Sequence, residues 1–305
     1  MNFVYSKEVE KHKNKNLPVL ALESTILAHG MPYPDNFNFA KKAESLCRKN
    51  GVAPATIAII DGVVHIGLEN KDLLLITNSK NIKKVSQREI GVSIIKKWTG
   101  ATTVSATIKL AYLANIPVFS TGGIGGVHKG VETSFDISED LSALSKAPVI
   151  VVSAGAKAIL DLKKTVEALE SFGIPVLGYK TNDFPAFYSQ GSGIKNITPV
   201  QSEKEIVDVF LTNKKFGLLT STLVVNPIPK KDEIPSAKIR DVLNQATKEA
   251  GRLSISGKNL TPFLLQFVMD KTGNRSLLAN KSLALNNVNL GIKIVKEVFK
   301  NKKNQ

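Results

Sequence analysis

The sequence predicts an α/β fold: a three-layer α/β/α sandwich with a mixed, mostly parallel central sheet and a helical C-terminal third. Short apolar runs of strand length alternate with helical patterns through Val225, and from Ile234 onward only helical patterns remain. The chain has 305 residues, of which 43% are hydrophobic, so it can bury a sizeable core. No linker or shift in composition divides the chain, and we therefore expect one domain over residues 1–305.

The apolar runs predict the strands, at residues 18–22, 56–60, 63–66, 73–76, 117–120, 148–152, 175–178 and 218–225. Pro117, Pro148 and Pro175 open three of these runs, where a proline removes no central hydrogen bond from the sheet. The helical patterns lie at 38–50, 103–114, 159–172, 202–210, 236–250, 261–272 and 276–300. Residues 1–16 are predicted to form a charged lead-in and residues 300–305 a basic tail, so that the ordered protein begins at Pro18.

The charge balance is strongly basic, with 41 Lys and Arg against 26 Asp and Glu and a formal net charge of +15. Such a charge attracts a nucleic acid, an anionic membrane or a phosphorylated small molecule. The lysines are dispersed along the chain, only five Tyr and one Trp are available for base stacking, and no nucleic-acid-binding signature occurs. We therefore favour a lysine-rich composition over a nucleic-acid-binding stripe, and expect no nucleic-acid partner.

Cysteine and histidine usage limits the cellular compartment and the kinds of metal site. The one cysteine, Cys47, can form no intramolecular disulfide and excludes a cysteine-rich zinc or iron–sulfur site. The four histidines include no His-x-x-x-His pair. No apolar run reaches the ~18 residues of a membrane span, and the first residues are too charged for a signal peptide. The sequence thus predicts a cytoplasmic protein without a membrane partner.

Ligands of open α/β sheets bind beyond the carboxyl ends of the strands, where three segments carry chemical groups. Glu23 follows the first apolar run, a glycine-rich segment at 121–130 follows the fifth, and Lys157 follows the sixth. The glycine segment can leave backbone N–H groups free to surround an anion, but it matches neither a Walker loop nor a dinucleotide fingerprint. A tight turn between a strand and a surface loop explains the glycines equally well.

Each candidate side chain has a functional and a structural interpretation. Lys157 follows β-branched and small residues that disfavour its ammonium form, which would make it a nucleophile, or it is a surface lysine that starts the next helix. Glu23 is an acid or base, or else a helix cap or ion-pair partner. The carboxylates of 135–140 suit a hard divalent cation that retains waters, or the acidic N-terminus of a helix. The cations of 83–88 could hold a phosphate, or form a solvated loop.

These segments, taken together, closely resemble the pseudouridine-5'-phosphate glycosidase family, also called indigoidine synthase A-like. The likeness runs from about Pro18 to Phe299. The matching strings are ALEST at 21–25, HGMPYP at 29–34, PATIA at 54–58, TGGIGGVH at 121–128, SFDIS at 134–138, AGAK at 154–157, NPIP at 226–229 and TPFLL at 261–265. Matches of this length, in order and spread over the chain, are far more specific than any one motif.

The resemblance implies a catalytic domain that reversibly cleaves the C–C glycosidic bond of pseudouridine 5'-phosphate, giving uracil and ribose 5-phosphate in pseudouridine catabolism. It also implies a homotrimer and one Mn²⁺ per subunit. Lys157 matches the lysine that forms a covalent adduct with the opened ribose, Glu23 the proton donor and Asp136 the metal ligand. The substrate-binding positions that the resemblance implies are Lys84, Val104, Ser138, Glu139 and Asp140, with His128 and Asn280 at the ribose phosphate and uracil end.

Three positions near these segments depart from the family pattern. Lys129 and Gln87 stand where arginine is usual, and Glu139 where a small residue is common. They leave open a Schiff-base lyase on another sugar phosphate or C-nucleoside phosphate. The net charge of +15 leaves open a second alternative, a basic protein that associates with nucleic acid. The preferred hypothesis is the glycosidase. A C–C glycosidic bond lacks a basic leaving oxygen, so its cleavage needs an electron sink, and an iminium formed by a lysine supplies one.

Overall fold

The structure, a computed structural model, describes residues 3–255 and 260–303. Within these ranges eleven strands form one sheet, in which β3 is antiparallel to β4 and to β6 and every other pair is parallel. The order is β1-β4-β3-β2-β7-β8-β11-β9-β10, with β6 beside β3 and β5 beside β6. The strands are β1 (Phe3–Tyr5), β2 (Val19–Leu22), β3 (Ala53–Ile60), β4 (Val63–Ile66), β5 (Lys83–Val85), β6 (Gly100–Thr102), β7 (Val118–Ser120), β8 (Ile150–Ser153), β9 (Val176–Tyr179), β10 (Thr198–Val200) and β11 (Thr222–Val225).

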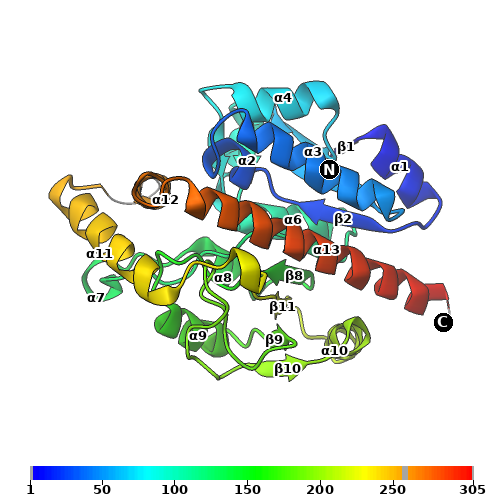
Figure 1. Cartoon of the computed structure of the whole chain (residues 1–305). Helices are drawn as coiled ribbons and strands as arrows, with labels where there is room; N and C mark the ends of the chain where they lie inside the picture. The colour runs from blue at the N-terminus through cyan, green and yellow to red at the C-terminus, as the bar shows by residue number, and fades with distance from the viewer. Residues whose placement is uncertain (1–2, 256–259, 304–305) are drawn as a thin grey trace.

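Helices cover both faces of this sheet, and the predicted mixed, mostly parallel α/β/α fold is confirmed. The long C-terminal helix α13 crosses one face in contact with β2, β7 and β8, between α3 and α10, while α6 packs on β2 and β7 together with α8 (Figure 1). The α-helices are α1 (Lys7–Asn14), α2 (Thr25–His29), α3 (Asp35–Lys49), α4 (Asn70–Asn78), α5 (Ile90–Ile95), α6 (Val104–Leu113), α7 (Val131–Ser134), α8 (Glu139–Leu144), α9 (Leu162–Ser171), α10 (Glu203–Lys215), α11 (Ser236–Arg252), α12 (Leu260–Lys271) and α13 (Arg275–Lys303). Two short 3₁₀ helices, η1 (Gln87–Glu89) and η2 (Lys230–Asp232), complete the elements.

The central strands are continuous apolar runs because helices cover the sheet on both sides. Every residue of β2, β3, β8 and β11 is buried. A side chain at Gly291 of α13 would come within 3.1 Å of Leu20 and 3.3 Å of Ser120, so glycine lets this helix lie close on β2 and β7. The core therefore sits along the middle of the sheet, directly behind the ends of the strands that carry the candidate residues.

The prolines punctuate the strands as predicted. Pro117, Pro148 and Pro175 each precede their strand by one or two residues, and none lies inside it. Their carbonyls remain available: Pro117 accepts a hydrogen bond from Ile150 N at 2.9 Å, and Pro175 one from Leu223 N at 3.0 Å. Proline therefore marks these strand entrances without interrupting the ladder.

Two of the predicted strands are wrong in type or extent. The run 73–76 lies in α4, where Leu73 and Ile76 are buried and Leu74 and Leu75 are exposed. That spacing is the helical period, which four apolar letters in a row conceal. The run 218–225 forms a strand only from Thr222 onward. The three-residue strands β5, β6 and β10 were not predicted, because they are too short to show an alternating pattern.

The predicted start of the ordered protein at Pro18 is also wrong. Residues 3–5 form β1, which pairs in parallel with β4, and α1 follows at once. Ser6 caps α1 by accepting a hydrogen bond from Val9 N at 3.3 Å, and Val9 is completely buried. The charges of this segment lie on the outer side of α1, so its polar composition concealed one apolar anchor.

Replacement of Val9 by alanine is expected to lower the free energy of unfolding by about 2 kcal/mol, because it removes buried methyl groups and leaves a cavity. Urea unfolding of the full chain measures this change. Replacement of Val4, which is 46% exposed on β1, is the matched control and should change stability by less than about 0.5 kcal/mol. A similar small effect at Val9 would contradict the anchoring role of α1.

The C-terminal segment continues the fold in part. Lys300 and the residues up to Lys303 extend α13, and residues 304–305 of the predicted basic tail lie outside the described residues. None of the helices in the described ranges has the length and apolar character that crossing a membrane requires.

Candidate active site

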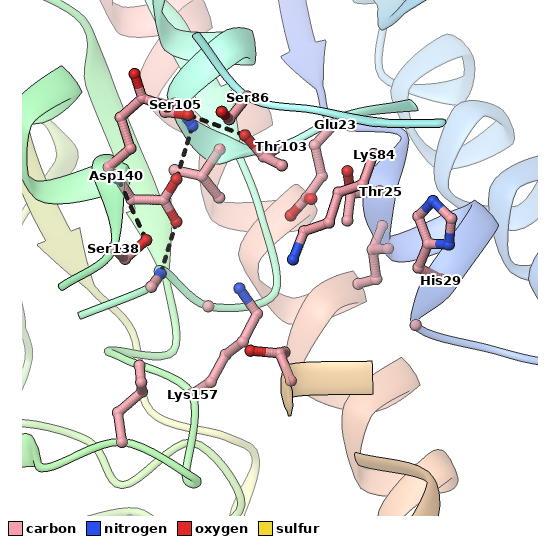
Figure 2. A pocket seen from close by; sticks show the side chains of 18 of the residues that line it. Glu23, Thr25, His29, Lys84, Ser86, Thr103, Ser105, Ser138, Asp140 and Lys157 are labelled. Carbon is pink, nitrogen blue, oxygen red and sulfur yellow. Dashed lines mark hydrogen bonds between the residues drawn. The ribbon is translucent and has the colours of Figure 1, made fainter. Parts of the chain in front are cut away.

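A cavity of about 280 Å³ opens beyond the carboxyl ends of β2, β5, β6, β7 and β8. The sequence placed Glu23, the glycine segment and Lys157 at strand ends, and the structure brings these together with the other candidate residues, including Asn280 from α13. The predicted residues that line the cavity are Glu23, Lys84, Val104, His128, Asp136, Ser138, Glu139, Asp140, Lys157 and Asn280. Figure 2 shows the head groups of Glu23, Lys84 and Lys157 turned toward the same space.

Glu23 directly follows β2 and is only 7% exposed. Burial raises the pKa of its carboxyl, while the positive charge of Lys157 and a hydrogen bond donated by the Thr121 hydroxyl oppose the rise. The nearby backbone N–H of Ile26, in the first turn of α2, opposes the rise in the same direction. Glu23 is therefore an acid that holds its proton to higher pH than an exposed glutamate.

Lys157 does not start a helix, since α9 begins at Leu162 with Asp161 as its N-cap. The lysine follows Gly155, whose φ of +80° turns the chain at the end of β8, and its backbone N–H donates to Ile124 O at 3.0 Å. The side chain is half-buried in the cavity wall. Its charge acts on both Glu23 and His128, so the amine lies among the groups with which a reaction would engage it.

The glycine loop after β7 does not leave all its N–H groups free, as the anion-binding interpretation would require. The N–H groups of Ile124 and His128 donate to backbone carbonyls, that of Val127 donates to Thr165, and that of Gly125 donates to Asp140 Oδ2 at 2.7 Å. A side chain at Gly125 would also come within 2.8 Å of the same Asp140 oxygen. The glycines therefore allow close packing of this loop on its neighbours, which the tight-turn interpretation anticipated.

Asp140 joins two cavity walls that are far apart in sequence. It lies in the first turn of α8 and is 6% exposed. Its Oδ1 accepts from Ser105 N at 2.8 Å, and its Oδ2 accepts from Gly125 N (Figure 2). Thr103, the N-cap of α6, makes no side-chain capping bond, so Asp140 caps α6 from another element. Both carboxylate oxygens are thus engaged by the protein itself.

Asp140→Asn is expected to lower the free energy of unfolding by about 3 kcal/mol, since one of two charge-assisted bonds is lost and an amide N–H faces a backbone N–H. It should also reduce kcat/KM, because α6 and the glycine loop lose their common anchor. Urea unfolding and steady-state kinetics measure the two effects. Asp208→Asn, at an exposed pair with Lys204, is the matched control and should change stability by less than about 0.5 kcal/mol. Equal behaviour of the two variants would contradict the anchoring role.

The predicted metal ligand Asp136 stands beside His128, with 4.0 Å between Asp136 Oδ2 and His128 Nδ1. Burial lowers the pKa of His128, Asp136 opposes this, and the positive charges of Lys157 and Lys84 add to it. Within residues 3–255 and 260–303, no group of three His, Cys, Asp or Glu side chains could hold a metal. One carboxylate at the edge of a polar cavity nevertheless fits a hard divalent cation that keeps most of its waters.

The α6 side of the cavity suits a phosphate. Val104 is the first residue of α6, so its backbone N–H belongs to the unpaired first turn of that helix. Lys84, Ser86 and Arg88 line the same cavity from β5 and the loop after it. Ser138 caps α8, with its hydroxyl accepting from Asp140 N at 3.3 Å, so the predicted capping role of this turn is correct. Glu139 adds a carboxylate oxygen, Oε2, that is buried and unpaired within the described part of the chain.

Several supporting residues were missed from the sequence. Thr121 donates to Glu23, as described above, and Phe187 forms part of the cavity wall. Asn287 of α13 is completely buried and donates to Thr121 O at 2.8 Å and Gly122 O at 3.2 Å, which fixes the start of the glycine loop. An asparagine on the otherwise apolar side of a long helix is the signal that could have identified it.

Comparisons with known proteins agree with this geometry. The model of the family described as indigoidine synthase A like protein matches residues 8–297. The chain is 48% identical over 296 residues to a pseudouridine-5'-phosphate glycosidase of Staphylococcus aureus (97% of this chain, 96% of that protein) and 45% identical over 302 residues to one of Mycoplasmopsis agalactiae (99% and 100%).

Two solved structures are similar over nearly the whole chain. One is an indigoidine synthase A-like protein of Thermotoga maritima, with a TM-score of 0.90 and 33% identity, covering 97% of this chain and 96% of that one. The other is a prealnumycin C-glycosynthase in complex with ribulose 5-phosphate, with a TM-score of 0.91 and 30% identity, covering 99% of both chains. The family match and these relatives together show that the chain belongs to the indigoidine synthase A-like family.

Proposed function

We propose that this protein is an enzyme that reversibly cleaves the C–C glycosidic bond of pseudouridine 5'-phosphate to give uracil and ribose 5-phosphate. The observation that carries the proposal is the cavity in which a lysine, a buried acid with a raised pKa and several cations meet at the strand ends. Relatives that are 45–48% identical over nearly their full length have the name of this activity. A phosphorylated C-nucleoside carries an anionic phosphate, which suits the cations that line the cavity.

Lys157 acts as the nucleophile through its neutral amine. Its Nζ forms a bond to C1' of the ribose, the bond from C1' to O4' breaks, and O4' takes the proton of Glu23. The Glu23 carboxylate then takes a proton from the alkylated Nζ, which restores the nitrogen lone pair, and delivers this proton to C5 of uracil. The bond from C1' to C5 breaks with its electron pair left on the uracil ring, and the nitrogen lone pair forms an iminium with C1'. Water hydrolyses the iminium, which releases ribose 5-phosphate and restores the amine.

The remaining residues hold the substrate for this sequence of steps. Lys84 and the N-terminus of α6 at Val104 attract the phosphate, and Ser138 offers a hydroxyl. Asp140 holds the N-terminus of α6 and the glycine loop in place through its hydrogen bonds to Ser105 N and Gly125 N. His128 and Asn280 face the ribose and the base. The largely buried setting strengthens each of these interactions relative to water.

We further propose Mn²⁺ as the cofactor, one per subunit, held at Asp136 with waters as its other ligands. When bound, the ion supplies positive charge that fixes the anionic substrate. Removal of divalent metal by a chelator is expected to reduce kcat/KM, and added Mn²⁺ should restore it. Asp136→Asn should weaken Mn²⁺ binding by at least about tenfold, a 1.4 kcal/mol effect, as followed by the electron paramagnetic resonance of free Mn²⁺. Unchanged Mn²⁺ binding in this variant would contradict the placement.

The homotrimer and the cytoplasmic location are also part of this proposal. An exposed apolar cluster between α10 and β11, formed by Phe216, Leu218 and Leu219, offers a surface suited to contact between subunits. Light scattering coupled to size-exclusion chromatography measures the assembly. A mass of about 33 kDa, that of one chain, would contradict the trimer.

The decisive test incubates the protein with Mn²⁺ and pseudouridine 5'-phosphate and follows uracil release. Uracil should appear in step with ribose 5-phosphate, and borohydride should fix the sugar phosphate on Lys157, as peptide mass spectrometry shows. The alternative activity is that of a Schiff-base lyase on another sugar phosphate or C-nucleoside phosphate. The similarity to a C-glycosynthase supports this alternative. Turnover of such a compound without any uracil release would decide for the alternative.

A further inference from the structure

A second cavity adjoins the active-site cavity, and the mechanism above leaves it without a role. It has a volume of about 160 Å³ and lies between the end of α2, the middle of α12 and the first turns of α13. His29, Gly30, Pro262, Leu265 and Asn280 line both cavities and so form a shared wall. A space of about 10 to 15 Å³ suffices for one water molecule, so the second cavity is large enough for a small organic molecule.

Two polar atoms on the shared wall have no partner in the described part of the chain. They are Nε2 of His29 and Oδ1 of Asn280, both buried. Asn280 as a whole is only 7% exposed. An unsatisfied buried polar group costs about 1 to 3 kcal/mol, so a ligand that supplies the missing hydrogen bonds here is favoured by that amount. A ligand with N–H or O–H donors would therefore satisfy the two unpaired atoms of the shared wall.

The charges of the two cavities differ sharply. The active-site cavity contains Glu23, Lys84, Arg88, Lys157 and further ionisable groups. Among the described residues that line the second cavity there is no Asp, Glu, Lys or Arg, and burial, together with the charge of Lys84, lowers the pKa of His29. A sugar phosphate is thus retained in the first cavity, whereas a neutral molecule can enter the second without the cost of desolvating a charge.

We propose that the second cavity is a binding site for the free nucleobase, through which uracil leaves and enters while the sugar phosphate stays at Lys157. This inference rests on the function proposed above. Uracil is neutral and flat, and its two N–H groups can donate to Asn280 Oδ1 and to a ring nitrogen of His29. Met269 and Leu277 supply apolar surface for its faces.

The position of His29 fits such a passage. The residue ends α2, six residues beyond Glu23, and Figure 2 shows its ring set apart from Lys157. Tyr188, which lines only the second cavity, is 2% exposed and gives that side a closely packed wall. The base therefore moves from C1' past a wall of neutral hydrogen-bonding groups, and the charged groups stay with the phosphate.

The test fills the second cavity without altering the first. Met269→Trp, at a half-buried position that lines only the second cavity, should raise the KM for uracil in the synthetic direction about tenfold, as expected for a blocked pocket. The inhibition constant of uracil in the cleavage direction should rise equally. The KM for ribose 5-phosphate and the yield of its borohydride-trapped adduct on Lys157 should stay within about twofold. Leu278→Trp is the control, because Leu278 is a 64% exposed residue of α13. It should change neither the KM for uracil nor the KM for ribose 5-phosphate.

A second variant covers the case in which the tryptophan at 269 prevents folding. His29→Ala should raise the uracil KM about fivefold through one lost hydrogen bond, with the Lys157 adduct retained. A folded Met269→Trp or His29→Ala protein with an unchanged uracil KM, or with equal rises in both KM values, overturns the inference and leaves the proposed function standing. A wild-type protein that releases no uracil overturns the proposed function itself, and the inference falls with it.

Discussion

Lys157→Ala is expected to abolish uracil release, with a fall in kcat/KM of about 10⁴-fold or more, as for other covalent nucleophiles. The reason is that, of the two lysines that line the cavity in the described part of the chain, only Lys157 follows Gly155, which turns the chain into the cavity at the end of β8. Steady-state assay of uracil and borohydride trapping measure activity and adduct separately. Both should be lost together in this variant.

Lys157→Arg separates nucleophilicity from charge. Arginine keeps the positive charge but stays protonated and cannot form the iminium, so this variant should bind ribose 5-phosphate and form no adduct. Lys163→Ala, on the exposed side of α9, is the matched control and should retain wild-type kinetics. Residual uracil release by Lys157→Ala near the wild-type rate would rule out the covalent mechanism.

Glu23→Gln is expected to reduce kcat by about 10² to 10⁴-fold, the range of a positioned general acid. Glutamine is nearly the same size but transfers no proton, so the cavity should remain intact. Burial raises the pKa of Glu23, so in the wild-type enzyme this acid should stay protonated at pH values above its ordinary pKa of 4.5. Cleavage activity should then fall as the pH rises through the raised pKa. The descending limb of the pH–rate profile should disappear in Glu23→Gln.

Two further measurements check the sign of this effect. Thr121→Val removes the hydrogen bond that stabilises the carboxylate, so the pKa should rise further and the descending limb should move to higher pH. A raised folded pKa also means that the contribution of Glu23 to stability is complete below 4.5 and is lost as the pH rises through the folded value. Glu23→Gln should therefore be at least as stable as wild type at neutral pH. A descending limb that persists in Glu23→Gln would assign it to another group.

The sequence predicted the fold because its signals are local. Apolar runs, prolines and glycines indicated the central strands, and the carboxyl-end rule then placed Glu23, the glycine loop and Lys157 at one edge. The same reasoning failed at 73–76, where four apolar residues do not distinguish a strand from a helix, and at Val9, a lone buried residue in a charged helix. Short segments carry too few periods to decide the matter.

The roles of the residues in the site were likewise only partly predictable from the sequence. The positions of Glu23 and Lys157 followed from residue type and from their place after a predicted strand, whereas the role of Asp140 did not. Its partners, Ser105 N and Gly125 N, lie 35 and 15 residues away, and backbone donors have no sequence signature. Asn287 reaches the glycine loop across 166 residues.

By itself, therefore, the sequence determined the mostly parallel sheet, the order of its main strands and helices, and the acid, the glycine loop and the lysine at its carboxyl edge. The tertiary structure decided which of these groups touch, which oxygens are already engaged, and that His29 and Asn280 divide a charged cavity from a neutral one. The physical reason is that secondary structure follows from the spacing of neighbours along the chain. The pKa of Glu23, the anchoring by Asp140 and the second cavity instead depend on burial and on contacts between distant segments.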